Sequence, residues 1–431
     1  MWNGLRPFPL PSGTGLGEGT LCQPRKEETM GIKMIGRRDF MKSTLAGFGG
    51  FFFLPSNDPK QEIRIVEGKG AAKKFVYRPL GKTGIKLPVI NMGVMNSNNP
   101  NLVRAALDSG MVMLDTAQTY QRGQNEGMIG EVLKGRPRDS YVLATKARPP
   151  VDQKTGPYTE EATEDAYLKK VDLSLKQLGL EYVDIYYHHG VSLRESALFE
   201  PTLKALEKVK KEGKARFVGI TTHRNEPEVI QAAIDSKIYD IILTTHNFKQ
   251  KHYLQVRNAI AKAAQAGLGV VVMKALGGRQ GLEGQTPVNV HAAFKWVLQD
   301  PNVHTVIAGF TAFDEMNTDL AVMEDLTLKD SEKEYLKTAF AVPGLYCQGC
   351  EKCLSQCSER LPIPDLMRAY MYTYDYRNLA HAQDLILSLN LPTRVCEDCS
   401  HCPVKCSIGF NVSRKIRDVV RLREVPSEFI A

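Results

Sequence analysis

The sequence predicts an α/β protein built on a (β/α)8 barrel, the TIM-barrel architecture, followed by a cysteine-rich segment. Eight short apolar or β-branched runs recur along the middle of the chain, and amphipathic helical patterns separate them. Eight such units in roughly 240 residues match the usual size of this barrel, about 250 residues. Eight of the nine cysteines lie in two tight groups near the C-terminus. We expect an N-terminal extension at residues 1–54, a polar linker at 55–74, the barrel at 75–330 and a cysteine-rich domain at 331–431.

The predicted strands are near-continuous apolar runs, as in a parallel sheet that helices cover on the outside. Segments between them, such as AYLKKVDLSLKQLGL, repeat apolar residues at helical spacing. A doubly wound sheet is the alternative, but its glycine fingerprint is missing after the first strand. The pair FVYRPLG and KLPVINMG predicts a hairpin that closes the barrel floor. The strands are expected at residues 88–94, 111–116, 141–146, 183–188, 216–221, 240–245, 269–274 and 304–309.

Composition excludes one class of partner. The chain has 431 residues, with 43% hydrophobic and 24% charged residues, as in ordinary globular proteins. Its net charge is +8, and the first 74 residues hold 12 Lys or Arg against 7 Asp or Glu. The remainder is nearly neutral and shows no case for the clustered basic face that nucleic-acid binding needs. We therefore expect no nucleic-acid partner.

The N-terminal extension carries an export pattern. GRRDFMK at residues 36–42 is followed by the short apolar run STLAGFGGFFFLP. A charged start before an apolar stretch too short to span a bilayer is typical of an export signal. Arg37 and Arg38, followed by Phe40 and Lys42, resemble the twin-arginine signal, and a chance arginine pair in a basic tail is the alternative. We expect export by the twin-arginine machinery, to the periplasm or to a membrane anchored by an uncleaved signal.

Four polar residues fall near the carboxyl ends of three adjacent predicted strands, where barrel enzymes place their catalytic groups. They are Asp115, Tyr120, Lys146 and His189. A free tyrosine has a pKa of about 10, and a neighbouring ammonium lowers that pKa. An aspartate can hold the lysine charged, and a neutral histidine can orient a carbonyl oxygen by hydrogen bonding. Together these side chains predict a general acid above a carbonyl group.

Each of these residues taken alone has a structural alternative, since an aspartate can cap the next helix and a histidine can be a hydrogen-bonded core residue. Their joint position at one barrel end favours the catalytic interpretation. No side chain supplies hydride, so the interpretation requires a nicotinamide cofactor.

Several segments resemble the aldo/keto reductase family. MLDTAQTYQRGQNEGMIGEVLKG resembles its signature, with Asp115 and Tyr120 at D-x4-Y spacing. VLATKAR resembles its third-strand lysine motif, with Lys146. In YVDIYYHHG, which resembles its fourth-strand motif, the matching histidine is His189 and not His188. The resemblance spans about residues 75–330 and implies reversible, NADPH-linked reduction of small aldehydes or ketones, in which Tyr120 protonates the carbonyl oxygen.

The same resemblance implies where NADP(H) or NAD(H) would lie. The loop after the last strand, GFTAFDEMNTDLAVMED, departs from the family pattern because it has no Lys or Arg to bind a 2′-phosphate. Lys274 and Arg279 are the candidate replacements. The other matching positions are Thr221 and Thr222 for the nicotinamide carboxamide, His246 for the stacking ring with Asn247 beside it, and Gly309, Phe310 and Thr311 for the diphosphate and adenosine side.

Two runs near the C-terminus share the spacing C-x2-C-x2-C-x3-C: CQGCEKCLSQC and CEDCSHCPVKC. This spacing resembles that of two-cluster ferredoxins, in which the fourth cysteine of each run ligates the other cluster. The resemblance implies a mostly helical, ferredoxin-like domain with two [4Fe–4S] clusters. The implied ligands are Cys347, Cys350, Cys353 and Cys406 for one cluster, and Cys357, Cys396, Cys399 and Cys402 for the other.

Zinc and disulfides are the alternatives for these thiols. A third cysteine so close in each run is unusual for tetrahedral zinc sites. Disulfides suit an oxidising compartment, but cysteines three residues apart are poor partners for one another. Ser358 and Ser407 replace the proline that usually follows the fourth cysteine.

The leader and the cysteines support each other, because iron–sulfur clusters are assembled in the cytoplasm and the twin-arginine route carries folded proteins. We expect an exported oxidoreductase that acts on a small carbonyl or alcohol, with clusters that relay electrons to a redox partner protein. The alternative is an electron-transfer or binding protein whose barrel no longer catalyses this reduction.

Overall fold

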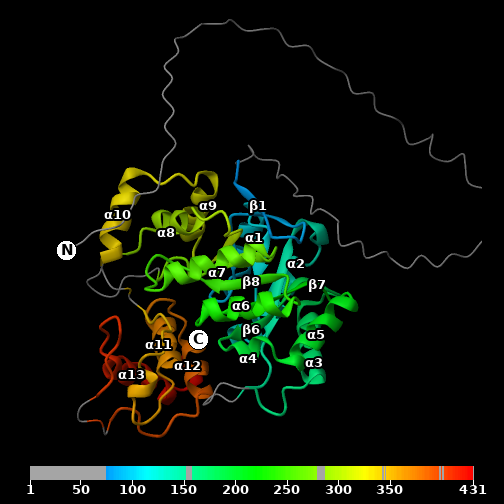
Figure 1. Cartoon of the computed structure of the whole chain (residues 1–431). Helices are drawn as coiled ribbons and strands as arrows, with labels where there is room; N and C mark the ends of the chain where they lie inside the picture. The colour runs from blue at the N-terminus through cyan, green and yellow to red at the C-terminus, as the bar shows by residue number, and fades with distance from the viewer. Residues whose placement is uncertain are drawn as a thin grey trace, which may run out of the picture. The chain divides into compact units, whose positions relative to one another are not determined.

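Eight parallel strands close into a barrel in the order β10-β3-β4-β5-β6-β7-β8-β9 (Figure 1). This computed structural model describes residues 74–151, 158–278, 287–341, 344, 346–397, 399 and 402–430. The predicted leader and all but the last residue of the predicted linker lie outside the described residues. All eight predicted strands are present: β3 (Ile90–Gly93), β4 (Met113–Asp115), β5 (Val142–Ala147), β6 (Val183–Val191), β7 (Ala215–Thr222), β8 (Ile241–Thr245), β9 (Gly269–Met273) and β10 (Thr305–Ala308).

The predicted hairpin is also present, as the antiparallel strands β1 (Tyr77–Pro79) and β2 (Lys86–Pro88). Leu80, in its turn, is buried with the side chains that fill the barrel interior. Gly81 has a φ of +55°, and a Cβ there would collide with the backbone of Gly269 at the start of β9. The hairpin therefore closes the amino-terminal end of the barrel.

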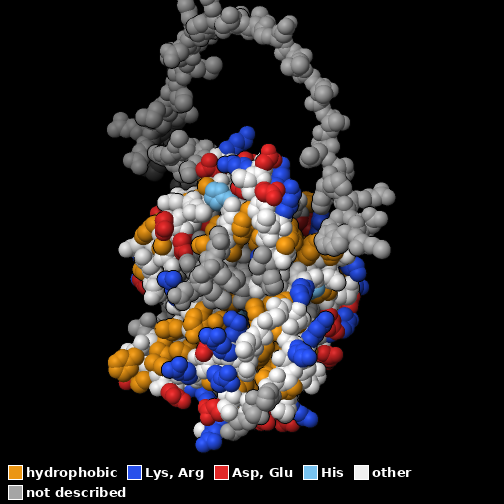
Figure 2. All heavy atoms as spheres, turned by 90° about the vertical axis from the view of Figure 1, so that its left-hand side faces the viewer, with side chains coloured by type: hydrophobic (Ala, Val, Ile, Leu, Met, Phe, Trp, Pro, Cys, Tyr) orange, Lys and Arg blue, Asp and Glu red, His pale blue; other side chains and the backbone are white. Residues whose placement is uncertain are grey.

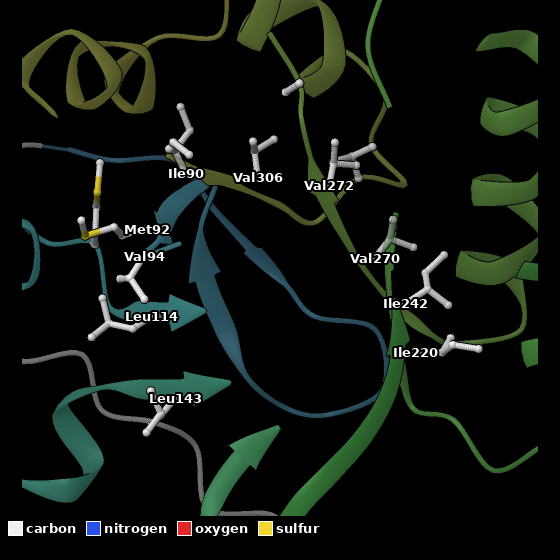
Figure 3. Close-up of a cluster of buried hydrophobic side chains, with 14 of the residues drawn as sticks. Ile90, Met92, Val94, Leu114, Leu143, Ile220, Ile242, Val270, Val272 and Val306 are labelled. Atoms are coloured by element: carbon white, nitrogen blue, oxygen red, sulfur yellow. The ribbon is translucent and has the colours of Figure 1, made fainter. Parts of the chain in front are cut away.

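Side chains alternate between the inside and the outside of the barrel, because successive residues of a strand point to opposite faces. On β8, Ile241 and Leu243 belong to the interior cluster, whereas Ile242 packs in the larger cluster beneath the helices. Figure 3 shows Ile242 with other members of this outer cluster, such as Val270 and Val306 from neighbouring strands. This alternation decides which residues reach the barrel mouth.

Helices follow the strands and cover the barrel (Figure 1). In α3, the Thr163 side chain caps the first turn by accepting a hydrogen bond from Ala166 N–H, and Gly179 in the left-handed region ends the helix. The helices are α1 (Pro100–Asp108), α2 (Asn125–Leu133), α3 (Glu164–Leu178), α4 (Arg194–Ala197), α5 (Glu200–Lys211), α6 (Glu226–Ser236), α7 (Tyr253–Gln265), α8 (Val290–Leu298), α9 (Phe313–Glu324) and α10 (Asp330–Ala341), with 3-10 turns η1 (Tyr120–Gly123) and η2 (Arg138–Ser140).

The C-terminal segment has a hydrophobic core of its own. The helix before it, α10, packs in the barrel core through Leu336 and Ala339, so the barrel's packing extends beyond the boundary at residue 330 that we expected. The elements of this segment, called the tail below, are η3 (Leu354–Gln356), α11 (Ile363–Tyr374), α12 (Leu379–Ser388), α13 (Val412–Val420), η4 (Arg421–Glu424) and η5 (Ser427–Phe429).

Helix α13 is strongly amphipathic. Val412, Ile416 and Val419 are buried, whereas Arg414 and Arg417 are exposed. Figure 2 shows basic side chains among hydrophobic ones on the lower part of the face turned to the viewer. Within the described ranges, no helix is long and apolar enough to cross a membrane.

Candidate active site and cysteine groups

The strand register carries three of the predicted catalytic residues to the open end of the barrel. Each stands two residues beyond a side chain of the interior cluster on the same strand, so each takes the next inward position. Because the strands are parallel, these positions meet at one end of the barrel. The pairs are Met113 and Asp115 on β4, Ala144 and Lys146 on β5, and Tyr187 and His189 on β6.

The two neighbouring histidines of β6 show this alternation. His188 is buried, and its ring nitrogens contact the hydroxyls of Tyr158 and Tyr239. Burial lowers the pKa of His188 to about 3. His189 lies edge-on to Tyr120, with ring centroids 6.2 Å apart. The histidine that matches the family motif is thus the one beside Tyr120.

Asp115, Tyr120, Lys146 and His189 are called the tetrad below. Within it, Lys146 contacts both Asp115 and Tyr120. Its ammonium donates hydrogen bonds to Asp115 Oδ1 and, at 2.7 Å, to the carbonyl oxygen of Thr116. It also lies 4.9 Å from the centre of the Tyr120 ring. The Lys146 and Asp115 side chains are both 2% exposed. Burial lowers the pKa of Lys146 and raises that of Asp115, whereas their mutual contact favours the charged form of each.

The acidity of Tyr120 differs from the expectation. We expected the ammonium of Lys146 to lower the pKa of the phenol. Burial instead raises the pKa of Tyr120 well above its ordinary value, and Asp115, Tyr372 and Tyr376 act in the same direction. Tyr120 is only 8% exposed, and the tail supplies both of these tyrosines.

The tail lies against the barrel mouth through ring contacts and ion pairs. The ring of His381 on α12 is edge-on to Tyr120, with centroids 6.3 Å apart. Arg122 of η1 forms an ion pair with Asp384 of α12 at 3.2 Å. Arg224, which follows β7, pairs with Glu351 of the tail at 3.2 Å. These contacts place α12 and the first cysteine run at the end of the barrel that holds the tetrad.

A hollow between barrel and tail lies beside the tetrad. It encloses about 720 Å³ of space, part of it open to solvent, and its lining includes His223 and Lys274 from the barrel and Cys347 and Arg368 from the tail. We call it the interdomain chamber. Burial lowers the pKa of His223 well below its ordinary value, and the charges of Lys274, Arg368 and Lys146 act in the same direction. His223 of the chamber is therefore close enough to Lys146 and His189, two of the predicted catalytic residues, to feel their charge.

Two of the predicted cofactor contacts line the chamber: Asn247 and Lys274. Burial and the charge of Arg368 lower the pKa of Lys274 to about 7. Thr221 and Thr222 use their hydroxyls within the barrel instead. The first accepts a hydrogen bond from Gly190 N–H at 2.7 Å, and the second donates to the carbonyl oxygen of Arg224 at 2.7 Å.

The other predicted cofactor contacts lie away from the chamber. His246 is 2% exposed and packs on Trp296 of α8, with ring centroids 5.1 Å apart. Phe310 is buried in the outer core cluster. The remaining two follow β10. Thr311 donates its backbone N–H to the Glu315 carboxylate at 2.9 Å, and a Cβ at Gly309 would lie 4.0 Å from the carbonyl oxygen of Gly93.

Four cysteines gather beside the chamber. Burial raises the pKa of the Cys353 thiol to about 11, and Cys347, Cys350 and Cys406 act in the same direction through their proximity. The Cys350 sulfur also lies 3.2 Å from the hydroxyl of Ser407. This group joins three cysteines of the first run to the last cysteine of the second run.

The other four cysteines surround a second hollow. Burial raises the pKa of the Cys396 thiol to about 11, with Cys399, Cys402 and Cys357 acting in the same direction. All four line a space of about 340 Å³, together with apolar side chains of α11 and α13. The two groups have the same members as the two ligand sets that the ferredoxin resemblance implies.

The sequence analysis missed the side chains that the tail contributes to the barrel mouth. Arg368, Tyr372, Tyr376 and His381 belong to a tyrosine-rich helical stretch that was visible in the sequence. Its pattern showed that these helices bury one face, but it contained no signal for the barrel residues that this face contacts.

Comparisons with known proteins agree with this geometry. The model of the aldo/keto reductase family matches residues 93–287. L-glyceraldehyde 3-phosphate reductase of Escherichia coli is 33% identical over 172 residues, which are 37% of this chain and 48% of that protein. L-galactose dehydrogenase of Arabidopsis thaliana is 33% identical over 163 residues, which are 34% of this chain and 49% of that protein. The chain thus spans about half the length of these curated relatives.

A solved structure shares the fold. An aldo-keto reductase from Bacillus halodurans in its holo form superposes with a TM-score of 0.51 at 24% identity, over 62% of this chain and 96% of that one. Both curated relatives are named for oxidoreductase activities, a reductase and a dehydrogenase. Residues 93–287 of the chain are thus similar to the aldo/keto reductase family, and the solved structure shows the shared fold. The tail lies beyond the residues that the family model matches.

Proposed function

We propose that this chain is an exported oxidoreductase of the aldo/keto reductase type. It reduces a small carbonyl compound, or oxidises the corresponding alcohol, and two [4Fe–4S] clusters in its tail relay electrons. The observation that carries this proposal is the shared burial of Tyr120, which has ring contacts with His189 of the barrel and His381 of the tail. Because the barrel and the cysteine-rich tail both contact Tyr120, the proposal couples carbonyl chemistry in the barrel to electron transfer in the tail.

The tetrad moves the proton in this proposal. The phenol of Tyr120 is protonated at neutral pH, as it is at its ordinary pKa of about 10, and it can donate to a carbonyl oxygen. Burial raises this pKa, so the phenol is a weaker acid than a free tyrosine until a neighbouring charge stabilises its phenolate. His189 is neutral, since burial lowers its pKa well below the ordinary value, and it can donate a hydrogen bond to the same oxygen. Lys146, above the ring, stabilises the phenolate that remains, and Asp115 holds the ammonium in place.

A nicotinamide cofactor, when bound, supplies the hydride that no side chain can provide. The residues matched to its contacts fit only in part. Asn247 and Lys274 face the chamber, whereas the hydroxyls of Thr221 and Thr222 are used within the barrel. The segment after β10 has no Lys or Arg to pair with a 2′-phosphate. Dinucleotide contacts in this chain therefore depart from the family pattern, and both NADPH and NADH belong in the assay.

The cysteine groups fit cubane clusters by their donors and surroundings. All eight are free thiols, which argues against the disulfide alternative. Among the residues that the structure describes, no three His, Cys, Asp or Glu side chains converge on one metal ion. A zinc site needs such convergence, whereas the thiolates of a cubane bind different irons. Clusters held by the two groups would supply one-electron transfer.

Export is proposed from the sequence, because Arg37 and Arg38 lie outside the described residues. The support is the pairing of this motif with a tail that needs its clusters inserted before export. Replacing both arginines by lysine should retain the protein in the cytoplasm, as cell fractionation would show. Unchanged fractionation of that variant would remove the twin-arginine proposal.

The function is tested by turnover with anaerobically purified protein. NADPH, NADH and a reduced one-electron donor are compared as electron sources against a panel of small aldehydes and ketones. Tyr120→Phe should abolish turnover while the iron content stays the same. Equal turnover by parent and variant would rule out Tyr120 as the acid.

A second candidate is an electron-transfer or binding protein whose barrel no longer catalyses NAD(P)H-dependent reduction. The cover that the tail places over Tyr120 and the missing phosphate-binding cation after β10 favour it. Calorimetry that detects no dinucleotide binding, on protein whose clusters accept electrons, would support this candidate over the first.

A further inference from the structure

The interdomain chamber has a one-sided distribution of charge. Four basic side chains line it, Arg224, Lys249, Lys274 and Arg368, and no Asp or Glu is among the described residues of its lining. A hollow lined by basic side chains and by no carboxylate is a favourable place for an anion, because the low dielectric of the interior strengthens their field.

Three of these four cations are engaged within the fold. Arg224 and Arg368 both pair with Asp365, at 3.4 Å and 3.3 Å, and the ammonium of Lys249 donates to the carbonyl oxygen of Ala339. Arg224 also pairs with Glu351 at 3.2 Å, so the two guanidiniums face two carboxylates and the charge of this group is balanced. Each guanidinium has five N–H donors, so donors remain for a further acceptor.

Lys274 is the exception. Its ammonium has no hydrogen bond or ion pair with any described residue. The two carboxylates that raise its pKa, Glu226 and Asp375, are not part of the chamber lining. Its backbone is held at a φ of +56°, a conformation that is uncommon for a residue with a side chain. Such backbone positions cluster at functional sites. The fold therefore directs into the chamber an amine that no described residue hydrogen-bonds and whose pKa burial lowers to about 7.

Polar atoms of the lining also lack partners. The hydroxyls of Thr245 and Tyr346 and the Nδ1 atom of His223 are buried and have no hydrogen bond with any residue that the structure describes. The side chains of Thr245 and Tyr346 belong to residues only 7% and 5% exposed. Buried polar groups in native proteins nearly always have a partner, so an unpaired set around one hollow points to a ligand that completes it.

We propose that the interdomain chamber binds the acid group, a carboxylate or a phosphate, of an anionic substrate between Lys274 of the barrel and Arg368 of the tail. The inference deepens the proposed function by naming its substrate class, and it rests on that function for calling the ligand a substrate. The guanidinium of Arg368 offers a planar pair of donors to the acid group, and the hydroxyls of Thr245 and Tyr346 are available to its remaining oxygen atoms.

Asn247 and Lys274, two of the matched cofactor positions, line the chamber, but the positions on the diphosphate and adenosine side do not, and this difference favours a small acid over a dinucleotide. Gly309, Phe310 and Thr311, which match the diphosphate and adenosine side of the family's cofactor site, are not part of its lining. His223, at the side of the chamber, lies near the tetrad. A short oxo-acid or sugar acid thus has its acid group in the chamber and its carbonyl group towards Tyr120.

Three probes with one carbon skeleton test the proposal: glycerol, glycerate and glycerol 3-phosphate. Binding to the full chain is measured by calorimetry. Glycerate, glycerol 3-phosphate or both should bind, and glycerol should not. Lys274→Met and Arg368→Gln should each weaken anion binding by about tenfold or more, as for loss of a hydrogen bond to a charged group. Lys274→Met removes no contact with a described residue, so the fold should be retained.

Lys211→Met, on the exposed end of α5, is the matched control and should bind like the parent. Absence of binding, equal binding of all three probes, or unchanged affinity in both chamber variants would overturn the proposal. The two chamber variants could instead shift the reduction potential of the cluster at the Cys347 group and leave anion affinity unchanged. That result would mean that Lys274 and Arg368 act on the cluster, and it would also overturn the proposal. Adenosine 2′,5′-bisphosphate is added as a fourth probe, and its Lys274-dependent binding without binding of the small acids would identify a dinucleotide site instead.

This experiment separates the inference from the proposed function, because binding requires no turnover. Suppose that anion binding depends on Lys274 but the protein shows no Tyr120-dependent turnover. The chamber would then remain assigned as an anion site, and the proposed enzymatic function would be rejected. Turnover of neutral carbonyl compounds without anion binding would support the enzymatic function and reject the anion site.

Discussion

Removing the carboxylate beside Lys146 is the most direct test of the buried tetrad. Asp115→Asn preserves the size of the side chain but leaves the ammonium, which is 2% exposed, without its anionic partner. Breaking a buried ion pair from one side costs about 3–5 kcal/mol, because a charge remains uncompensated. The hydrogen bond from Lys146 to Thr116 persists. We therefore expect a loss near the lower end, about 3 kcal/mol at pH 7.

This loss should shrink as the pH rises. Burial already lowers the pKa of Lys146 in the folded chain, and removal of Asp115 lowers it further, whereas the unfolded value stays at about 10.4. Between these two values the unfolded chain binds more protons than the folded chain, so stability rises with pH. The unfolding midpoint of Asp115→Asn should lie closer to that of the parent at pH 9 than at pH 7.

Urea unfolding followed by fluorescence measures the effect. With a slope of about 3 kcal/mol per molar urea, the expected loss shifts the barrel midpoint by about 1 M. The double variant Asp115→Asn/Lys146→Met should recover most of this loss, because it leaves no unpaired buried charge. Glu200→Gln removes the partner of exposed Lys204 and should leave the midpoint unchanged. A single variant as stable as Glu200→Gln, or a double variant no better than the single one, would refute the buried charged pair.

The remaining predictions concern the barrel interior, acid stability and the cysteine groups. Gly219→Ala should destabilise the barrel by about 1–3 kcal/mol in urea unfolding, because the new Cβ would lie 2.5 Å from the Tyr187 ring. Gly127→Ala, whose Cβ would enter open space, is the control. Equal urea midpoints for the two variants would contradict the packing at Gly219. Stability should fall as the pH drops from 6.5 towards 4, since burial lowers the pKa of His246 to about 4 and the unfolded chain binds the proton first. His246→Phe should flatten this part of the pH profile of urea midpoints, and an unaltered profile would count against it. Cys357→Ser should reduce iron from about eight to about four atoms per chain and match Cys399→Ser in its spectrum; a spectrum matching Cys350→Ser instead would contradict the grouping.

Local patterns were sufficient for the barrel itself. Apolar runs at regular intervals located all eight strands, and the pair of runs before the first strand located the hairpin of β1 and β2. Motif spacing selected His189 over His188, and strand alternation explains the choice, because inward positions repeat every second residue. These features depend on neighbours within a few residues of one another, so they can be read along the chain.

The cofactor contacts were harder to predict because matching a position does not reveal what its side chain already binds. Thr221 and Thr222 match contact positions, but their hydroxyls have partners inside the barrel. His246 matches a stacking position, but it packs on Trp296 of the outer helices. Side-chain partners depend on packing between elements that are distant in the sequence.

By itself, the sequence determined the barrel, the four residues at its mouth and the rhythm of two cysteine runs, because each depends on short-range spacing. Only the tertiary structure decided that the tail covers Tyr120, raises its pKa and encloses a basic chamber with Lys274 and Arg368. Those properties arise where groups that are distant in the chain come into contact. Arg122 and Gln383, for example, are 261 residues apart and form a hydrogen bond. Burial and electric field are sums over such contacts, and no local pattern of residues contains them.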